Sequence, residues 1–93
     1  MKTISVQQFC IHYNIPESFI DSLSNFELIE LVEMDSDKHI YFEDINRIEM
    51  LIRIHYELNV NYEGLDIINN LLNEINSLQE DIINLRNRMN LYE

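Results

Sequence analysis

The last third of the chain carries an apolar repeat of the coiled-coil type, and this repeat restricts the folds open to the chain. Apolar side chains recur at alternating steps of four and three residues, which places them on one stripe of a helix. The stripe consists of Leu71, Ile75, Leu78, Ile82, Leu85, Met89 and Tyr92. Ile75, Ile82 and Met89 occupy one core position of the heptad, and the other four occupy the second. The repeat predicts a long helix whose seam faces another helix.

This predicted helix needs a packing partner. Seven Asn residues lie between positions 69 and 90, and each disfavours a helix by up to about 0.7 kcal/mol relative to Ala. At about 1.5 Å per residue the segment reaches roughly 33 Å, which is too far for a small head to cover. A second copy of the chain is the economical partner, so the sequence predicts a homodimer with the seven seam residues at its interface. Packing back onto the chain's own head is the alternative, and the orientation of a dimer stays open.

The start of the chain predicts two short helices joined by a tight turn. Ser5 is a suitable N-cap for a first helix over residues 5–13, whose apolar side chains have helical spacing. Asn14-Ile15 forms the turn, and Pro16 suits the first turn of a second helix that runs to about residue 25. Two short helices in this arrangement are typical of a helix-turn-helix unit.

The middle of the chain predicts a hairpin followed by a central helix. Residues 28–34 and 40–42 have strand-like composition and flank a polar turn. A third helix then starts near Glu43, and Asn61 can cap the fourth helix, which continues into the heptads. We therefore expect a mainly α fold with two parts. Residues 1–60 form a helix-turn-helix head with a small β-hairpin wing, and residues 61–93 form a helical extension with the coiled-coil helix.

The charge of the chain conflicts with DNA binding by such a head. The formal net charge is −11, and nine acidic residues lie between positions 17 and 44, where only Lys38 opposes them. Affinity for DNA comes mainly from cations at the phosphates, and the predicted second helix contains none. Binding to DNA is therefore not expected. The acidic stretch is either a solvated surface or a docking surface for a basic partner.

Candidate catalytic and metal-binding residues do not form a recognisable site in the sequence. Cys10 and His12 are two residues apart on a predicted helix, so they point in different directions. Cys10 has no marked base, and His55 fits the edge of a core. We expect a non-enzyme without cofactor or metal. The single cysteine fits a cytoplasmic location, and we expect no membrane segment.

The order of these features resembles a known family. The resemblance rests on Phe9-Cys10-x-His12 with Ile15, on Phe42 followed by acidic residues, on Arg53-x-His55-x-Glu57-Leu58, on Gly64, and on heptads ending in Arg86-x-Arg88. The head is similar to MerR-type winged helices. The whole chain is similar to the chaperone-modulator (CbpM) family, whose members share that head.

The resemblance implies a function in chaperone regulation. It implies a modulator that binds the J-domain of a DnaJ-like or CbpA-like co-chaperone and inhibits its cooperation with the Hsp70 chaperone DnaK. Glu27, Glu30 and Glu33 are the acidic residues that we expect at this contact. Two alternatives stay open at this point. One is a MerR-like transcriptional regulator that binds DNA, and the other is a coiled-coil adaptor whose head is only a cap.

Overall fold

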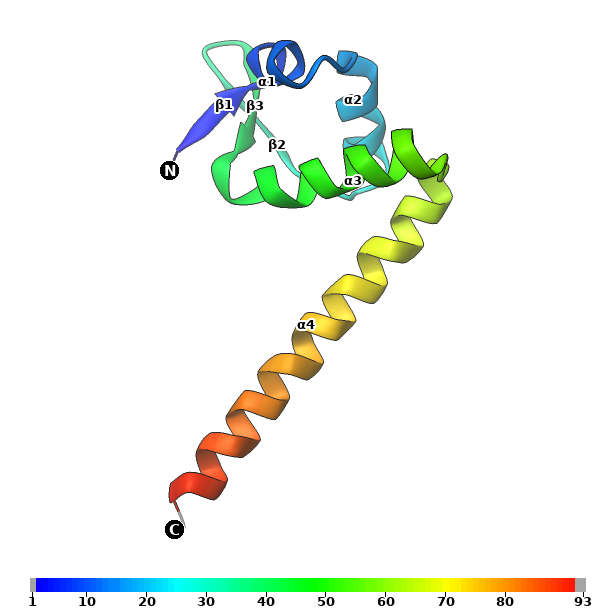
Figure 1. Ribbon diagram of the computed structural model, residues 1–93. Coiled ribbons are helices and arrows are strands. Elements are labelled where there is room, and N and C mark those ends of the chain that lie inside the picture. Colours follow the sequence, from blue (N-terminus) through cyan, green and yellow to red (C-terminus); the bar gives the residue numbers. More distant parts are fainter. Residues whose placement is uncertain (1, 92–93) are drawn as a thin grey trace.

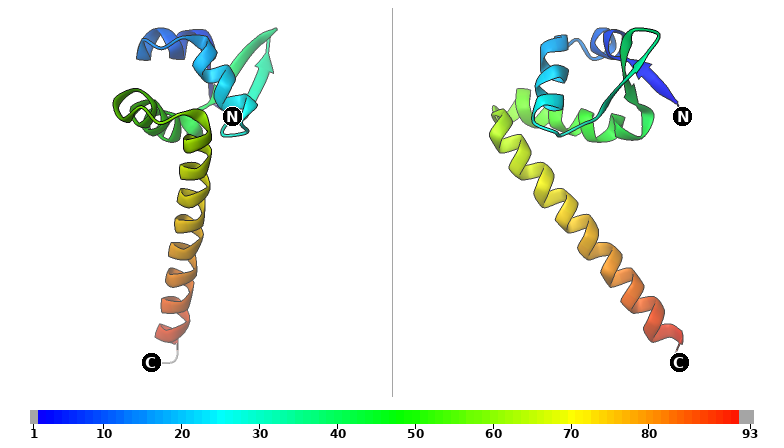
Figure 2. Two further views of the ribbon diagram at one scale, coloured as in Figure 1. Left: turned by 90° about the vertical axis from the view of Figure 1, so that its right-hand side faces the viewer. Right: turned by 180° about the vertical axis from the view of Figure 1, so that it is seen from behind.

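The computed structural model describes residues 2–91 and consists mainly of helices (Figure 1). A head is followed by one long helix, which projects away from it as an arm (Figures 1 and 2). The elements in chain order are β1 (Thr3–Ser5), α1 (Val6–Tyr13), α2 (Glu17–Asn25), β2 (Leu31–Met34), β3 (Asp37–Tyr41), a 3-10 turn (Phe42–Asp44), α3 (Ile45–Leu58) and α4 (Tyr62–Leu91). The molecule measures 54 × 32 × 21 Å. The predicted fold class is confirmed.

The caps of α1 and α2 explain why these helices begin and end where the sequence predicts. The Ser5 hydroxyl accepts a hydrogen bond from the backbone N–H of Gln8 at 3.1 Å, which satisfies one free donor at the start of α1. Asn14 ends α1 in the left-handed conformation, with φ at 55°. Pro16 then directs the chain into α2, since its fixed φ suits a helix start.

The hairpin differs from its prediction at both strands. Strand β2 pairs antiparallel with β3, with Leu31 opposite Ile40 and Met34 opposite Asp37. The strand predicted at residues 28–34 begins only at Leu31, because Leu28 and Ile29 are both buried. Neighbouring side chains of a strand point to opposite faces, so a strand with one solvated face could not bury both. The return strand, predicted at 40–42, starts earlier, at Asp37, and ends at Tyr41.

A third strand, which the sequence pattern did not predict, completes the sheet. Strand β1 pairs antiparallel with β3, and Thr3 lies opposite Tyr41 while Ser5 lies opposite His39. The strand order is β1-β3-β2, so β3 is the central strand. A three-residue strand is too short to show an alternating pattern, and its partner lies far away in the sequence.

One hydrophobic core holds the head together. Each helix contributes large side chains that are almost fully excluded from solvent, and β3 contributes one more. They include Phe9, Phe19, Ile20, Leu23, Ile40, Ile48, Leu51 and Leu65. Burial of one such side chain stabilises a fold by about 1.5–3 kcal/mol. Leu65 belongs to α4, so the first turns of this helix pack into the core. The division of the chain at residue 60 stays a prediction.

A tight corner between α3 and α4 sets the start of the arm. Asn59 ends α3 with φ at 57°. His55 is half-buried at the edge of the core. Its Nδ1 donates a hydrogen bond to the Val60 carbonyl oxygen at 2.8 Å. The side-chain oxygen of Asn61 accepts a hydrogen bond from the backbone N–H of Gly64 at 2.8 Å. Asn61 therefore caps α4, as predicted.

Substitution Gly64→Ala is expected to destabilise the chain, although the same change in a helix normally stabilises it. A Cβ atom at position 64 would lie 2.6 Å from Cγ1 of Val60, which is closer than van der Waals contact allows. We expect a loss of about 1 kcal/mol in the free energy of unfolding, because overpacking exceeds the gain in helix propensity. Urea unfolding measures it, and Asn70→Ala on the exposed helix surface serves as a control that should not destabilise. An increase in stability for Gly64→Ala would contradict this account of the corner.

Candidate functional site

Helix α2 occupies the position of the DNA-reading helix of a helix-turn-helix, and its outer surface is acidic. Its buried side is apolar and consists of Phe19, Ile20 and Leu23. Glu17 and Asp21 are one helical turn apart and lie at least partly in solvent. Between them and the end of the helix only Ser and Asn side chains reach the surface. The helix therefore offers carboxylates and hydroxyls, without a cation for a phosphate.

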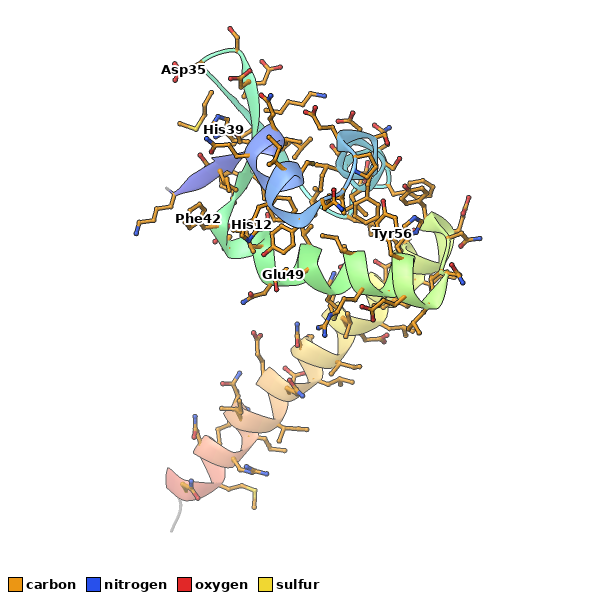
Figure 3. The ribbon with its side chains drawn as sticks, turned by 45° about the horizontal axis from the view of Figure 1, so that its top comes forward. His12, Asp35, His39, Phe42, Glu49 and Tyr56 are labelled. Atoms are coloured by element: carbon orange, nitrogen blue, oxygen red, sulfur yellow. The ribbon has the colours of Figure 1, made fainter. Side chains whose placement is uncertain are left out.

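The hairpin extends this acidic surface. Asp35 and Ser36 form its two-residue turn, both with positive φ (53° and 68°), which matches the twist of the strands. Asp35 lies at the tip of the hairpin (Figure 3). Nζ of Lys38 lies 3.4 Å from a carboxylate oxygen of Asp21, and this is the one ion pair among residues 2–91. Because both side chains are about half exposed, the pair is worth little. It nevertheless neutralises the only cation of this region.

Shallow grooves run between α2 and the hairpin. One of about 410 Å³ lies between the end of α2 and both strands, and one of about 590 Å³ continues along the segment that joins α2 to β2. The two grooves share Ser24 and Leu31, so they form a continuous depression. The first is lined by Asp21, Ser24, Asn25, Leu31, Glu33 and Lys38, and the second by Ser24, Glu27, Ile29, Glu30 and Leu31. We call this depression, with its carboxylates, the acidic groove.

The structure brings the three predicted contact residues to this groove. Glu27 and Glu30 line the same part of it, and Glu33 lines the adjoining part from β2. All three side chains are exposed. Glu27 has φ at 60°, so the chain turns sharply there as it leaves α2. Their role in binding stays a prediction. The structure does show that all three line one groove, which their spacing in the sequence does not establish.

The sequence did not predict two other contributors to the groove. In the sequence, Asp21 lies in the predicted second helix with no sign of a partner, and Leu31 lies in a predicted strand with no sign of a surface role. In the structure Asp21 holds Lys38, while Leu31 provides an apolar side chain beside the carboxylates. The contact between α2 and the hairpin joins residues 17 positions apart, so no local pattern indicates it.

The histidines and the cysteine do not form a reactive centre. His12 is exposed and Cys10 is buried, although they lie on the same helix. Nδ1 of His39 lies 3.1 Å from the Thr3 hydroxyl, and His55 contacts the Val60 carbonyl. Within residues 2–91, no group of three or more His, Cys, Asp or Glu side chains has the arrangement of a metal site.

Aromatic side chains of α1 and α2 contact the other helices of the head. The Tyr13 hydroxyl donates a hydrogen bond to the Glu49 carboxylate, which joins α1 to α3, and this bond raises the pKa of Tyr13 above its usual value. Phe19 lies against His55, Tyr56 and Tyr62, with ring centroids 5.1–6.0 Å apart. These contacts pack the buried side of α2 against α3 and the start of α4. The helix that borders the acidic groove is therefore held in place by the core of the head.

Cys10 is expected to react slowly with alkylating reagents while the chain is folded. Burial, with smaller effects of Glu17 and Asp21, raises the pKa of the thiol to about 11 from 9.0. At pH 8 the folded chain then holds about 100-fold less thiolate than the unfolded chain, and the thiolate is the reactive form. Between pH 9 and pH 11 the folded state holds more protons than the unfolded state, so stability falls as the pH rises. Iodoacetamide rates with and without guanidinium measure the difference, and equal rates would contradict it.

The coiled-coil seam on α4 is uncovered in the monomer. Leu71, Ile75, Leu78, Ile82, Leu85 and Met89 are 48–63% exposed, and Tyr92 lies outside the described residues. The head packs on another side of the helix, where Leu65 and Asn69 are buried and Arg47 donates a hydrogen bond to Asn73 at 3.2 Å. The chain therefore does not fold its seam onto its own head. None of the helices within residues 2–91 has the length and apolar character that a membrane crossing requires.

Comparison with protein families gives one match, which covers most of the chain. Residues 4–87 match the family described as MerR HTH family regulatory protein. The match includes the helix-turn-helix, the hairpin, α3 and most of α4. Neither the curated proteins nor the solved structures provide a match.

Proposed function

The chain belongs to the MerR HTH family of regulatory proteins, and within this family we propose that it is a chaperone modulator. In this role it binds the J-domain of a DnaJ-like or CbpA-like co-chaperone and inhibits its cooperation with the Hsp70 chaperone DnaK. The proposal rests on one main observation. The helix that would read DNA carries Glu17 and Asp21 and no cation, and the only cation nearby is paired with Asp21.

Electrostatics favours a basic protein over DNA as the partner of this head. Binding to DNA gains its free energy from the release of counterions when cations contact phosphates. Lys38 is the only Lys or Arg between Glu17 and Asp44, and nine carboxylates surround it in sequence. Phosphates would be repelled, whereas a basic surface would be attracted and oriented. The similarity to chaperone modulators implies such a partner, because J-domains present a basic helix.

The acidic groove fits a helix with basic side chains. Its carboxylates lie on two sides, with Asp21 on α2 and Glu33 on β2, and Leu31 lies between them. A cation from the partner could replace Lys38 beside Asp21, since that pair is half exposed and weak. Glu27 and Glu30 extend the same negative surface along the connecting segment.

Calorimetry with a J-domain from the same cell tests this proposal. We expect binding at low salt and weaker binding at moderate salt, because opposite charges on two surfaces are screened. In a second assay, the chain should reduce the stimulation of DnaK ATPase activity by the full co-chaperone. Absence of binding at both salt concentrations would refute the proposal.

The family match favours a second candidate function, which is regulation of transcription through DNA binding. The head has the helix-turn-helix and hairpin of a MerR-type regulator. Fluorescence anisotropy with genomic fragments distinguishes the two functions. Tight, salt-sensitive binding to DNA would support the transcriptional role and would contradict the charge-based reasoning above.

We also propose that the chain acts as a homodimer through the seam of α4. A stripe of six half-exposed apolar side chains is costly to leave in water, and its regular spacing suits a second helix. The Asn residues of α4 make an isolated helix weak, so pairing would also stabilise the arm.

A further inference from the structure

We propose that the free edge of β2 binds an extended polypeptide segment in which basic and apolar residues alternate. The segment adds a further strand to the sheet, beside the acidic groove. This inference goes beyond the proposed function, because the segment need not belong to a J-domain and is recognised through its backbone. Three observations carry it: the unpaired edge of β2, the carboxylates beside one face of that edge, and the apolar side chains on the other face.

Strand β2 has backbone groups that no other strand uses. It lies at the edge of the sheet, because the strand order is β1-β3-β2. Its two-residue turn makes Met34 and Asp37 a hydrogen-bonded pair, and such pairs alternate with non-bonded ones along an antiparallel ladder. The N–H and C=O groups of Val32 therefore face β3, whereas those of Leu31 and Glu33 point away from it. Within residues 2–91, no loop or turn forms a backbone hydrogen bond to Leu31 or Glu33.

The other side of β3 agrees with this alternation. The Phe42 N–H, just after β3, donates a hydrogen bond to the Lys2 carbonyl oxygen, just before β1, at 3.1 Å. Phe42 therefore faces β1, and so does Ile40, which lies opposite Ile4. His39, between them in this pattern, faces β2, as its pairing with that strand requires.

One face of the edge borders the acidic groove. Leu31 and Glu33 point to this face, and both line the groove. A strand added beside β2 places alternate side chains on the same face, next to Glu33 and toward Glu27 and Glu30. Opposite charges on directly paired residues of neighbouring strands attract each other. Lys or Arg therefore fits these positions of the added strand.

The opposite face of the edge is apolar. Val32 is half-buried, and Met34 is 43% exposed. The Thr3 hydroxyl lies 3.4 Å from the Met34 sulfur, so side chains of this face are in contact from β1 to β2. The remaining side chains of an added strand stand beside Val32 and Met34, where apolar groups pack best. A segment with alternating basic and apolar residues thus matches both faces.

The charge of the edge selects a basic segment over a second copy of the chain. Edge strands are often protected from pairing by Pro or Lys, and β2 contains neither. Its one charged residue is Glu33. Pairing with β2 of a second copy brings another Glu33 to an edge that is already acidic, which is unfavourable. A basic segment gains attraction at the same place.

Backbone pairing distinguishes this ligand from a helix. The N–H and C=O groups of an α-helix are bonded within the helix, so they cannot pair with Leu31 and Glu33. In strand addition the main chain provides affinity, and alternate side chains provide specificity. A basic helix and an extended segment use the same carboxylates of the acidic groove, so binding of one excludes the other.

Three capped seven-residue peptides of alternating Val and Lys test the pairing with the full chain. One is unmodified, one has N-methyl groups on its Lys residues, and one has them on its Val residues. Charge and side chains are the same, but only one edge of an extended peptide faces β2. In fluorescence anisotropy, one analogue alone should bind about tenfold more weakly than the unmodified peptide, since it loses about two backbone hydrogen bonds. Equal binding of all three peptides, or equal loss in both analogues, would overturn edge pairing.

Amide hydrogen exchange places the peptide on the chain. With the unmodified peptide at saturation, the N–H groups of Leu31 and Glu33 should exchange at least about tenfold more slowly, because they become hydrogen-bonded. Those of Val32 and Met34 already face β3 and serve as internal references. Unchanged exchange at Leu31 and Glu33 would contradict the proposal.

A peptide with Glu in place of each Lys tests the charge requirement. It should not bind, and binding as tight as that of the Lys peptide would refute a role for the carboxylates. Calorimetry with the J-domain gives an independent result. A chain that binds the J-domain but not the unmodified peptide at low salt would lose this inference and keep the proposed function. Peptide binding without J-domain binding would have the reverse meaning.

Discussion

Leu78→Asp is expected to convert the proposed dimer into a monomer and to unfold much of the arm. Leu78 is in the middle of the seam, and each dimer would receive two carboxylates there. Loss of two buried Leu side chains alone costs about 3 kcal/mol, so the dissociation constant should rise at least about 100-fold. Without a partner, the Asn-rich helix after the head should fray.

Sedimentation velocity over a range of concentrations measures the dimer, and circular dichroism measures the helix content. Ile83→Asp is the matched control, because Ile83 is 55% exposed and Leu78 is 57% exposed, but Ile83 lies off the seam. It should leave the dimer nearly unchanged. An unchanged Leu78→Asp dimer, or equal damage from both variants, would refute the seam assignment.

The monomer produced by Leu78→Asp also separates the modulator from an adaptor. If the acidic groove binds the J-domain, the separated head should keep some affinity, since no residue of α4 after Leu65 belongs to its hydrophobic core. Complete loss of J-domain binding in a chain with a folded head would favour the adaptor, in which the coiled coil provides the contact.

Replacement of Glu27, Glu30 and Glu33 by Gln is expected to weaken J-domain binding roughly tenfold. Each exposed ion pair contributes about 0.2–1 kcal/mol, so three together account for a change of this size. The three side chains line adjoining parts of the groove and are exposed, so the fold should tolerate the change. The weakening should be largest at low salt and should shrink as salt is added.

A second triple variant shows whether position matters in addition to net charge. Glu57→Gln, Glu63→Gln and Glu80→Gln remove the same charge from exposed positions on α3 and α4. This variant should bind the J-domain with nearly the affinity of the unchanged chain. If both triple variants lose the same affinity, then the net charge of −11 carries the attraction and the groove has no specific role.

The sequence predicted the helices well because their signals are local. Ser5, Pro16 and Asn61 mark helix starts through their own backbone preferences, and all three lie at or next to the start of a helix in the structure. The heptads predicted the uninterrupted length of α4, since a regular repeat extends over many residues. The class of the fold follows from these elements.

The sheet and the groove depend on contacts between residues that are far apart in the sequence. A local sequence pattern cannot predict such contacts. Strand β1 forms because β3 offers it a free edge, and the strand itself is only three residues long. Strand β2 starts late because tertiary packing buries Leu28 and Ile29 first. The position of Lys38 beside Asp21 follows from the way the hairpin folds over α2. The excess of acidic residues is evident from the sequence. The groove that these residues line is evident only from the structure.

The central claim is that the head binds a basic protein through the surface between Glu17 and Asp44. Nuclear magnetic resonance of the ¹⁵N-labelled chain, titrated with the J-domain, tests this claim most directly. The claim predicts that amide shifts concentrate on α2, on the connecting segment with Glu27 and Glu30, and on the hairpin. The amides of residues 74–91 should stay unchanged. Shifts confined to α4, or no shifts at saturating J-domain, would contradict it.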